Sequence, residues 1–209
     1  MTNANTTAAA NATARPVAYA KPGATLLNAD DHTLVMIDFQ SQMAFATHSI
    51  DAITLRSNAG LVARAAAGFG VSTILTTVAE KSFSGPMFEE VTAPFPGQAL
   101  LDRTSMNTWE DEAAYKAIVG TKKQKLVFAG LWTGVCIVGP ALSALEENYD
   151  VYVITDACGD VSDEAHERAV QRMIHSGVKP MTSIQYTLEL QRDWARQETY
   201  TAVNDLMKK

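Results

Sequence analysis

The sequence predicts an α/β domain of the doubly wound type, in which helices cover both faces of a parallel sheet. Short apolar runs alternate with helix-like stretches along most of the 209 residues, and this alternation is typical of βα units. The run KLVFAGL carries no charge after its first residue, as expected of a strand that is covered on both faces. The length suits one large domain rather than two.

Six strands can be placed in order along the chain. We expect them over residues 33–37, 71–77, 99–101, 125–131, 151–155 and 180–183. Helices are expected over about residues 51–67, 109–120, 135–148, 163–176 and 184–207, several of them ended by glycine. A long loop rich in Gly and Pro, residues 78–97, separates the second and third strands, and loops of this length are often functional.

The first 29 residues differ in composition from the rest. Residues 1–20 are mostly Ala, Thr and Asn, with no acidic residue and one Arg. They lack the continuous apolar core of a secretory signal and the basic residues of a targeting peptide. We therefore expect residues 1–29 to form a flexible or surface-draped tail and residues 30–209 to form the folded domain.

Charge and cysteine content limit the expected partners. The net charge of −6 disfavours nucleic acid, whose binding depends on clustered Lys and Arg. No apolar run is long enough to suggest a membrane partner. Cys136 and Cys158 form neither a CxxC pair nor a disulfide framework, which favours a reducing, cytoplasmic location.

Residues with catalytic potential lie where predicted strands end. Asp38 ends the first strand, Asp102 and Arg103 follow the third, Cys136 follows the fourth, and Asp156 ends the fifth. Ligands of doubly wound sheets bind at these carboxyl ends, near the point where the strand order reverses. These positions therefore predict an active site at that edge of the sheet.

Cys136 lies at the predicted start of a helix. Unpaired N–H groups and the helix dipole at such a position favour a thiolate and could stabilise an oxyanion. Asp38 is the nearest candidate for the base that activates the thiol. The alternative is that Cys136 is a small buried apolar residue, and the residues alone leave both interpretations open. Cys158, beside acidic residues, is expected to serve packing.

No cofactor or metal is expected. Gly68 and Gly70 precede a strand, whereas a dinucleotide fingerprint follows one, and no P-loop motif occurs. The histidines do not form a pair with metal-ligand spacing, and surface or capping roles are expected for them: His32, His48, His166 and His175.

Several segments together resemble one known family. These are LVMIDFQ, ILTTVAEKSFSGP, NTWEDE, AGLWTGVCIVGPALSALEENYDVYVITDACG and ELQRDW, and they include a Gly-x-x-Thr-x-x-Cys pattern at residues 130–136. They are similar to the isochorismatase-like cysteine hydrolases, and to the YcaC-like branch in particular, over about residues 30–194. The resemblance implies a three-layer α/β/α fold with a six-stranded parallel sheet of order 3-2-1-4-5-6.

The resemblance also implies an Asp, Lys, Cys triad. Asp38 and Cys136 match it, and Arg103 stands where the family has Lys. Arginine stays charged, so Arg103 can orient Asp38 but cannot shuttle a proton. The family further implies a cis peptide between Trp132 and Thr133, and an oxyanion hole formed by the N–H groups of Thr133 and Cys136. The metal-binding histidine of a related branch is missing from residues 78–82.

These expectations define a cysteine hydrolase that cleaves an amide-type C–N bond of a small molecule through a thioester. The expected walls of the substrate pocket are Phe39, Asn107, Trp109 and Trp132, although ordinary core packing could account for each of them. Two alternatives stay open: hydrolysis of an isochorismate-like vinyl ether, and a non-catalytic oligomeric protein. The resemblance implies a homo-oligomer, such as a ring-like tetramer or octamer.

Overall fold

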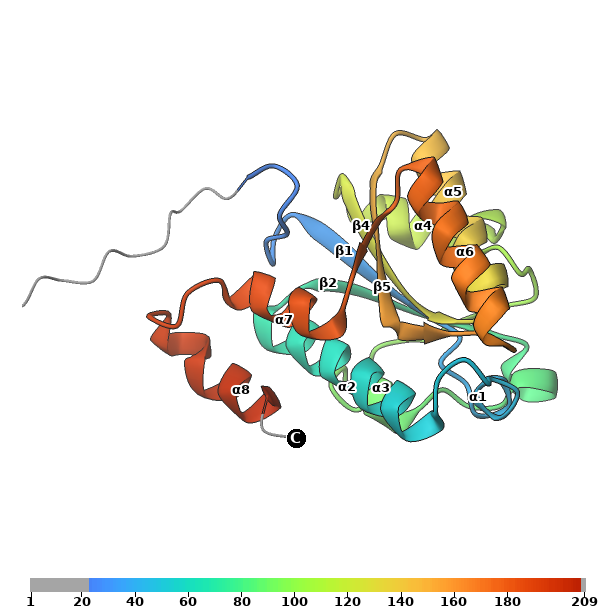
Figure 1. The fold of residues 1–209 in the computed structure, drawn as a ribbon, viewed down its shortest axis with the longest axis horizontal. Coiled ribbons are helices and arrows are strands. Elements are labelled where there is room, and N and C mark those ends of the chain that lie inside the picture. The colour runs from blue at the N-terminus through green and yellow to red at the C-terminus, as the bar shows by residue number, and fades with distance from the viewer. Residues whose placement is uncertain (1–22, 208–209) are drawn as a thin grey trace, which may run out of the picture.

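The computed structural model describes residues 23–207, which fold around a six-stranded sheet (Figure 1). The strands are β1 His32–Ile37, β2 Ser72–Val78, β3 Leu101–Arg103, β4 Lys125–Leu131, β5 Asp150–Gly159 and β6 Lys179–Met181. Their order is β3-β2-β1-β4-β5-β6, and every neighbouring pair is parallel. The predicted fold class and strand order are confirmed.

Helices cover both faces of the sheet, so the domain has three layers (Figure 1). One face carries α2 Ala52–Phe69, α3 Glu89–Thr92, α7 Ser183–Gln191 and α8 Gln197–Met207. The other carries α4 Glu112–Gly120, α5 Val138–Glu146 and α6 Asp163–Ser176. A short helix, α1 Ser41–Phe45, follows the carboxyl end of β1.

The central strands explain this layering. Leu34 and Met36 of β1 belong to one apolar core, whereas Val35 and Ile37 belong to the other, and all four are inaccessible to solvent. Because successive side chains of a strand point to opposite faces, a continuous apolar run requires cover on both sides. Within residues 23–207, no helix is long and apolar enough to cross a membrane.

All strands except β4 differ from their predicted bounds, and the differences in β3 and β5 have a clear structural reason. β3 begins at Leu101 rather than at residue 99, because it pairs with the end of β2 in the register Thr76↔Leu101 to Val78↔Arg103. β5 continues beyond residue 155 to Gly159, because a bulge lets the ladder with β4 resume. Asp156 therefore lies inside β5, where its carboxylate accepts hydrogen bonds from the N–H and hydroxyl of Ser183.

The ends of the chain also refine the predicted boundary. Residues 1–22 of the predicted tail lie outside the described residues, as do residues 208–209. The segment 23–29 packs on the domain. Leu27 is completely buried, its N–H donates to Glu189 Oε1 at 2.6 Å, and its carbonyl accepts from Arg192 Nη2 at 2.7 Å. The folded unit thus begins before residue 30.

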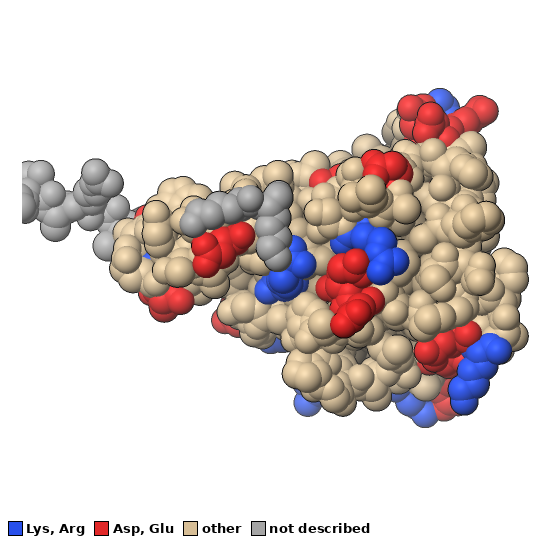
Figure 2. Space-filling view, turned by 90° about the horizontal axis from the view of Figure 1, so that it is seen from below, with Lys and Arg blue, Asp and Glu red and all other residues tan. Residues whose placement is uncertain are grey.

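The surface offers mixed rather than segregated charge on the face seen from below. Small groups of acidic and basic side chains lie next to one another there, without a broad area of one sign (Figure 2). Also at the surface of the protein, Arg56 and Glu90 form a partly exposed ion pair at 2.8 Å.

Candidate active site

Asp38 lies at the carboxyl end of β1, in the centre of the sheet. It is completely buried, has a positive φ of 54°, and donates its N–H to the Thr76 carbonyl at 2.9 Å. Neighbouring β4 comes unusually close here, since a Cβ on Gly130 would lie 1.8 Å from the Ile37 carbonyl oxygen. Only glycine fits at that position, and the close approach sets the spacing of the two strand ends.

Arg103 reaches Asp38 from β3. Its Nη2 donates to Asp38 Oδ2 at 2.8 Å and its Nε donates to Thr108 Oγ1 at 3.1 Å. Both charged side chains of the pair are shielded from solvent. A buried pair of this kind is held by geometry and by its further hydrogen bonds, because both ions have lost their hydration.

Cys136 lies in a π-helical turn, Thr133–Ile137, that joins β4 to α5. Cys136 is 1% exposed, and its backbone N–H donates to the Trp132 carbonyl at 3.0 Å. Burial, followed by the negative charge of Asp38, raises the pKa of the thiol to about 12, although Arg103 opposes the shift. Burial thus opposes a resting thiolate at Cys136, whereas the sequence predicted that N–H groups at a helix terminus favour one.

Asp38 interacts with both partners. Burial raises its pKa to about 6, while Arg103 and the Cys136 thiol act in the opposite direction. Oδ2 is bonded to Arg103, whereas Oδ1 and Arg103 Nη1 have no hydrogen-bond partner among the described residues. Oδ1 is thus the carboxylate oxygen that Arg103 does not engage. At neutral pH the site combines a carboxylate, a guanidinium and a neutral thiol.

The cis peptide is displaced by one residue from the expected position. It joins Leu131 to Trp132, whereas we expected it between Trp132 and Thr133. Leu131 is the last residue of β4 in register with β5, and Thr133 already begins the π turn. The change of chain direction therefore falls on the bond before Trp132.

Two residues whose role the sequence did not predict, Asp160 and His166, make hydrogen-bonding contacts with the π turn. The Gly134 N–H donates to Asp160 Oδ2 at 2.6 Å. Thr133 Oγ1 donates to the Gly159 carbonyl at 3.1 Å and lies 2.8 Å from His166 Nδ1. His166, expected at the surface or at a cap, is half-buried, and burial lowers its pKa. No local sequence signal identifies these contacts, because they join segments about 30 residues apart.

A cavity of about 390 Å³ opens beside Cys136. It is walled mainly by apolar side chains, with two hydroxyls and the thiol: Met43, Val78, Ala79, Phe83, Ser84, Thr104, Met106, Trp132, Val135 and Cys136. Trp132 lies on its wall and donates its Nε1–H to the Met43 carbonyl and to Thr47 Oγ1, each at 3.1 Å.

Three residues expected to wall the pocket lie elsewhere, which corrects those predictions. Phe39 is completely buried in the apolar core, because the residue after Asp38 points back under the sheet toward Phe88. Asn107 caps the turn Thr108–Glu110 and donates to Ser143 Oγ. Trp109 packs edge-on against Tyr115 and Tyr149 between α4 and α5.

Gln40 is a further residue that sequence reasoning missed. Its buried side-chain amide accepts from the Val78 N–H at 2.9 Å and donates to the carbonyls of Val78 and Gly85 at 3.2 and 2.7 Å. Gln40 thus bonds to both ends of the segment 78–85. This segment forms one wall of the cavity, through Val78, Ala79, Phe83 and Ser84. No local pattern identifies this role, because the positive φ of Asp38 interrupts the strand alternation and the partners of Gln40 lie 38 and 45 residues along the chain.

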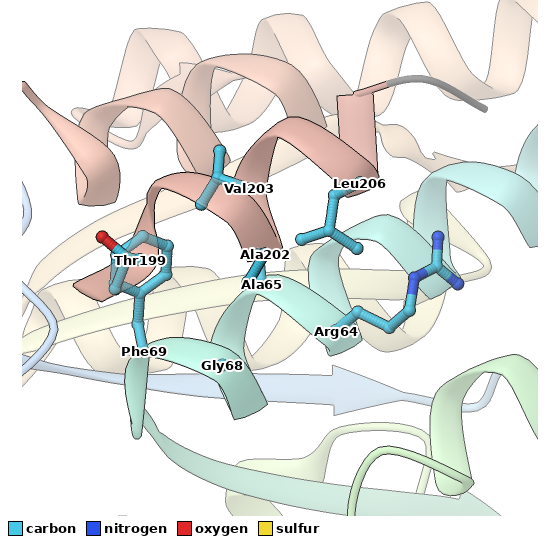
Figure 3. Close-up of a pocket in the computed structure, with 8 residues that line it drawn as sticks. All are labelled: Arg64, Ala65, Gly68, Phe69, Thr199, Ala202, Val203 and Leu206. Carbon is cyan, nitrogen blue, oxygen red and sulfur yellow. The ribbon is translucent and has the colours of Figure 1, made fainter. Parts of the chain in front are cut away.

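A second, smaller pocket lies far from this chemistry, between α2 and α8 (Figure 3). Its volume is about 110 Å³, and its walls include Ala65 and Phe69 of α2 and Val203 and Leu206 of α8. Arg64 points along its edge in the close-up. The packing of the last helix accounts for this pocket, which shares no residue with the Cys136 cavity.

Comparison with known proteins places this arrangement in a family. Residues 32–185 match the family model of the isochorismatase domain, and the chain belongs to the isochorismatase family. Within that family it is similar to the YcaC-like hydrolases. It is 34% identical to the probable hydrolase YcaC of Escherichia coli over 169 residues, which cover 80% of this chain and 81% of that protein.

Two solved structures show the same similarity in three dimensions. The E. coli YcaC structure, described as an octameric hydrolase of unknown specificity, superposes with a TM-score of 0.81 at 32% identity, covering 90% of this chain and 97% of the other. YcaC from Pseudomonas aeruginosa, solved with hexane-2,5-diol and covalent acrylamide, gives 0.81 at 30% identity, covering 90% and 98%. The predicted resemblance to the YcaC-like branch is confirmed.

Proposed function

We propose that the protein is a cysteine hydrolase that cleaves an amide-type C–N bond of a small molecule through a thioester. The observation that carries this proposal is the contact of three buried groups, the Asp38 carboxylate, the Arg103 guanidinium and the Cys136 thiol, beside an open cavity. A nucleophile next to a base that is itself oriented by a third group is the general arrangement of covalent catalysis.

The reaction starts from a neutral thiol. Cys136 Sγ bonds to the substrate carbonyl carbon while Asp38 Oδ1 takes the thiol proton. The C–N bond then breaks, and the proton passes from Asp38 to the leaving nitrogen. Water attacks the thioester with Asp38 again as base, which releases a carboxylic acid and restores the thiol. A base with a pKa of about 6 suits both directions of this transfer near neutral pH.

Arg103 and the π turn have supporting roles in the proposal. Arg103 fixes the orientation of Asp38 and keeps it charged until the thiol proton moves. The N–H groups of Thr133 and Cys136 hold the oxyanion. Because the Cys136 N–H already donates to the Trp132 carbonyl, the oxyanion must share or replace that bond.

The proposal extends to assembly and location, which relatives and cysteine chemistry support. The octameric E. coli YcaC supports a homo-oligomer for this chain, in the form of a ring-like octamer or tetramer. Both cysteines are free and buried, which fits a reducing cytoplasm.

Alkylation and turnover test the proposal together. Acrylamide is the probe, since it is found covalently bound in the P. aeruginosa structure. The expected result is one adduct at Cys136 by peptide mass spectrometry, at least tenfold slower in Asp38→Asn and unchanged in Cys158→Ala. Hydrolysis in a screen of small amides should disappear in Cys136→Ala.

The same screen separates the alternatives. Turnover that survives Cys136→Ala would favour the vinyl-ether reaction, which does not need the thiol. The absence of turnover from every amide and vinyl ether, with an unreactive Cys136, would favour a non-catalytic oligomer.

A further inference from the structure

The walls of the Cys136 cavity carry no charge. Among the described residues that line it, apolar side chains come from four separate segments, represented by Met43, Phe83, Met106 and Val135, and none is acidic or basic. Trp132 contributes its ring while its one N–H donor is used by Met43 and Thr47. Most of the contact that the cavity offers is therefore apolar.

The polar groups in the cavity are hydroxyls. Ser84 and Thr104 both line it, and Ser84 Oγ is buried without a hydrogen-bond partner among residues 23–207. A buried polar atom without a partner is costly and invites one. A hydroxyl both donates and accepts, so it suits an uncharged carbonyl, amide or alcohol group of a ligand.

The buried cation of the site does not balance an anionic ligand. Arg103 is not among the residues that line the cavity and is paired with Asp38 at 2.8 Å, so the two charges offset each other. A ligand carboxylate in the cavity would lose its hydration without gaining a counter-ion, which is unfavourable. An uncharged ligand avoids this cost and gains from apolar burial.

We infer that this cavity selects an uncharged, mainly apolar acyl compound, and this inference rests on the proposed function. Its size also limits the ligand. An apolar cavity of about 150 Å³ holds benzene, which has six non-hydrogen atoms. At the same volume per atom, a cavity of about 390 Å³ holds roughly fifteen non-hydrogen atoms. The substrate class is thus a short-chain or single-ring amide without a carboxylate.

Matched reagents of different charge test the inference. Iodoacetamide and iodoacetate have similar size, and their rates at Cys136 are each divided by their rates with free N-acetylcysteine amide. The normalised rate should favour iodoacetamide at least tenfold. A ratio near one, or a preference for iodoacetate, overturns the inference. This holds also if the preference arises because a neighbouring subunit supplies a cation.

A binding measurement remains informative even if Cys136 proves unreactive and the proposed function fails. Hexanamide and hexanoate are titrated calorimetrically into the Cys136→Ser protein. Hexanamide should bind at least tenfold more tightly, and equal or tighter binding of hexanoate overturns the inference.

A pair of exposed phenylalanines gives a matched variant and control. Phe83 lines the cavity and is 65% exposed, whereas Phe45 is 85% exposed and lies outside the lining. Phe83→Arg should strengthen hexanoate binding at least tenfold, because it places a cation at the mouth, and Phe45→Arg should not. Equal effects of the two variants would contradict the assignment of the cavity as the binding site.

Discussion

Arg103 donates to Asp38 across 2.8 Å, and neither side chain is exposed to solvent. The pair joins the ends of β3 and β1, which do not neighbour each other in the sheet because β2 lies between them. Its loss would therefore leave one buried charge without its partner, and the cost of an unpaired buried charge exceeds what the pair itself contributes.

Arg103→Met should lower the free energy of unfolding by about 3–5 kcal/mol at pH 8. The loss should shrink at pH 5, where protonation removes the unpaired charge of Asp38. Urea unfolding at both pH values measures this. Lys116→Met, which breaks the exposed pair with Glu112, is the control and should have little effect at either pH. An equal loss for Arg103→Met at pH 5 and pH 8 would contradict the electrostatic explanation.

The reactivity of Cys136 should depend on the ionisation of Asp38. Because the pKa of Asp38 is raised to about 6, the base is lost as the pH falls below that value. The rate of Cys136 alkylation should thus fall about tenfold per pH unit below pH 6 and stay nearly constant from pH 7 to 8. In Asp38→Asn the alkylation rate should no longer be constant from pH 7 to 8. It should instead rise with pH as the Cys136 thiol ionises.

The same pKa makes a prediction about stability. A folded-state pKa of about 6, against an ordinary value of 3.8, means that the folded protein binds this proton more tightly than the unfolded chain. The resulting stabilisation is present below pH 4 and is lost as the pH rises through 6, by about 3 kcal/mol. Asn cannot titrate, so Asp38→Asn should not lose this stabilisation. From pH 4 to pH 7 the unfolding free energy of the variant should therefore rise by this amount relative to that of the unchanged protein. A constant difference would show that the pKa of Asp38 is ordinary.

The sequence predicted the sheet well because its strands are buried on both faces. The runs in β1 and β4 are apolar at consecutive positions, which only a covered parallel strand requires. Asp38 and Cys136 were identifiable because strand ends meet at one edge of such a sheet. The short strand β3 was displaced by two residues, because pairing with β2 rather than its own apolar residues sets its position.

The walls of the cavity could not be predicted in the same way. Phe39 follows the first predicted strand and Trp109 begins a predicted helix, but the fold places Phe39 in the core and Trp109 between two helices. The observed walls include Met43, in the five-residue helix α1, and Met106, in an irregular segment, and both segments are too short to show a periodic pattern. Long-range contacts such as Thr133 to His166 depend on the finished fold and leave no local signal.

Gly130 should be irreplaceable for steric reasons. Its φ is 149°, and a Cβ would lie 1.8 Å from the Ile37 carbonyl oxygen. Gly130→Ala should therefore cost more than the roughly 1–3 kcal/mol of an unfavourable φ alone, and it should slow Cys136 alkylation by separating the ends of β1 and β4. Gly68→Ala is the control. It lies in α2 with no atom within 4 Å of the added Cβ, and it should stabilise the protein by about 0.5–1 kcal/mol. Similar thermal shifts for both variants would contradict the steric argument.

Gln40→Leu should damage the cavity without touching the triad. The substitution keeps the side chain similar in size but leaves the Val78 N–H and the Gly85 carbonyl without their bonds to the Gln40 amide. A buried polar group without a partner costs about 1–3 kcal/mol, so unfolding free energy should fall by about 2–5 kcal/mol.

The consequence for the site distinguishes this variant from a merely unstable one. Gln98→Leu is the matched control, because Gln98 makes one exposed bond to the Thr73 carbonyl at 2.8 Å and should cost little. In Gln40→Leu the wall formed by residues 78–84 loses its fixed position, so hexanamide should bind Cys136→Ser/Gln40→Leu at least fivefold more weakly than Cys136→Ser. The pH dependence of Cys136 alkylation should keep its midpoint near 6 in the single variant, because Asp38 and Arg103 remain paired. A shifted midpoint would mean that Gln40 acts on the charged groups rather than on the wall.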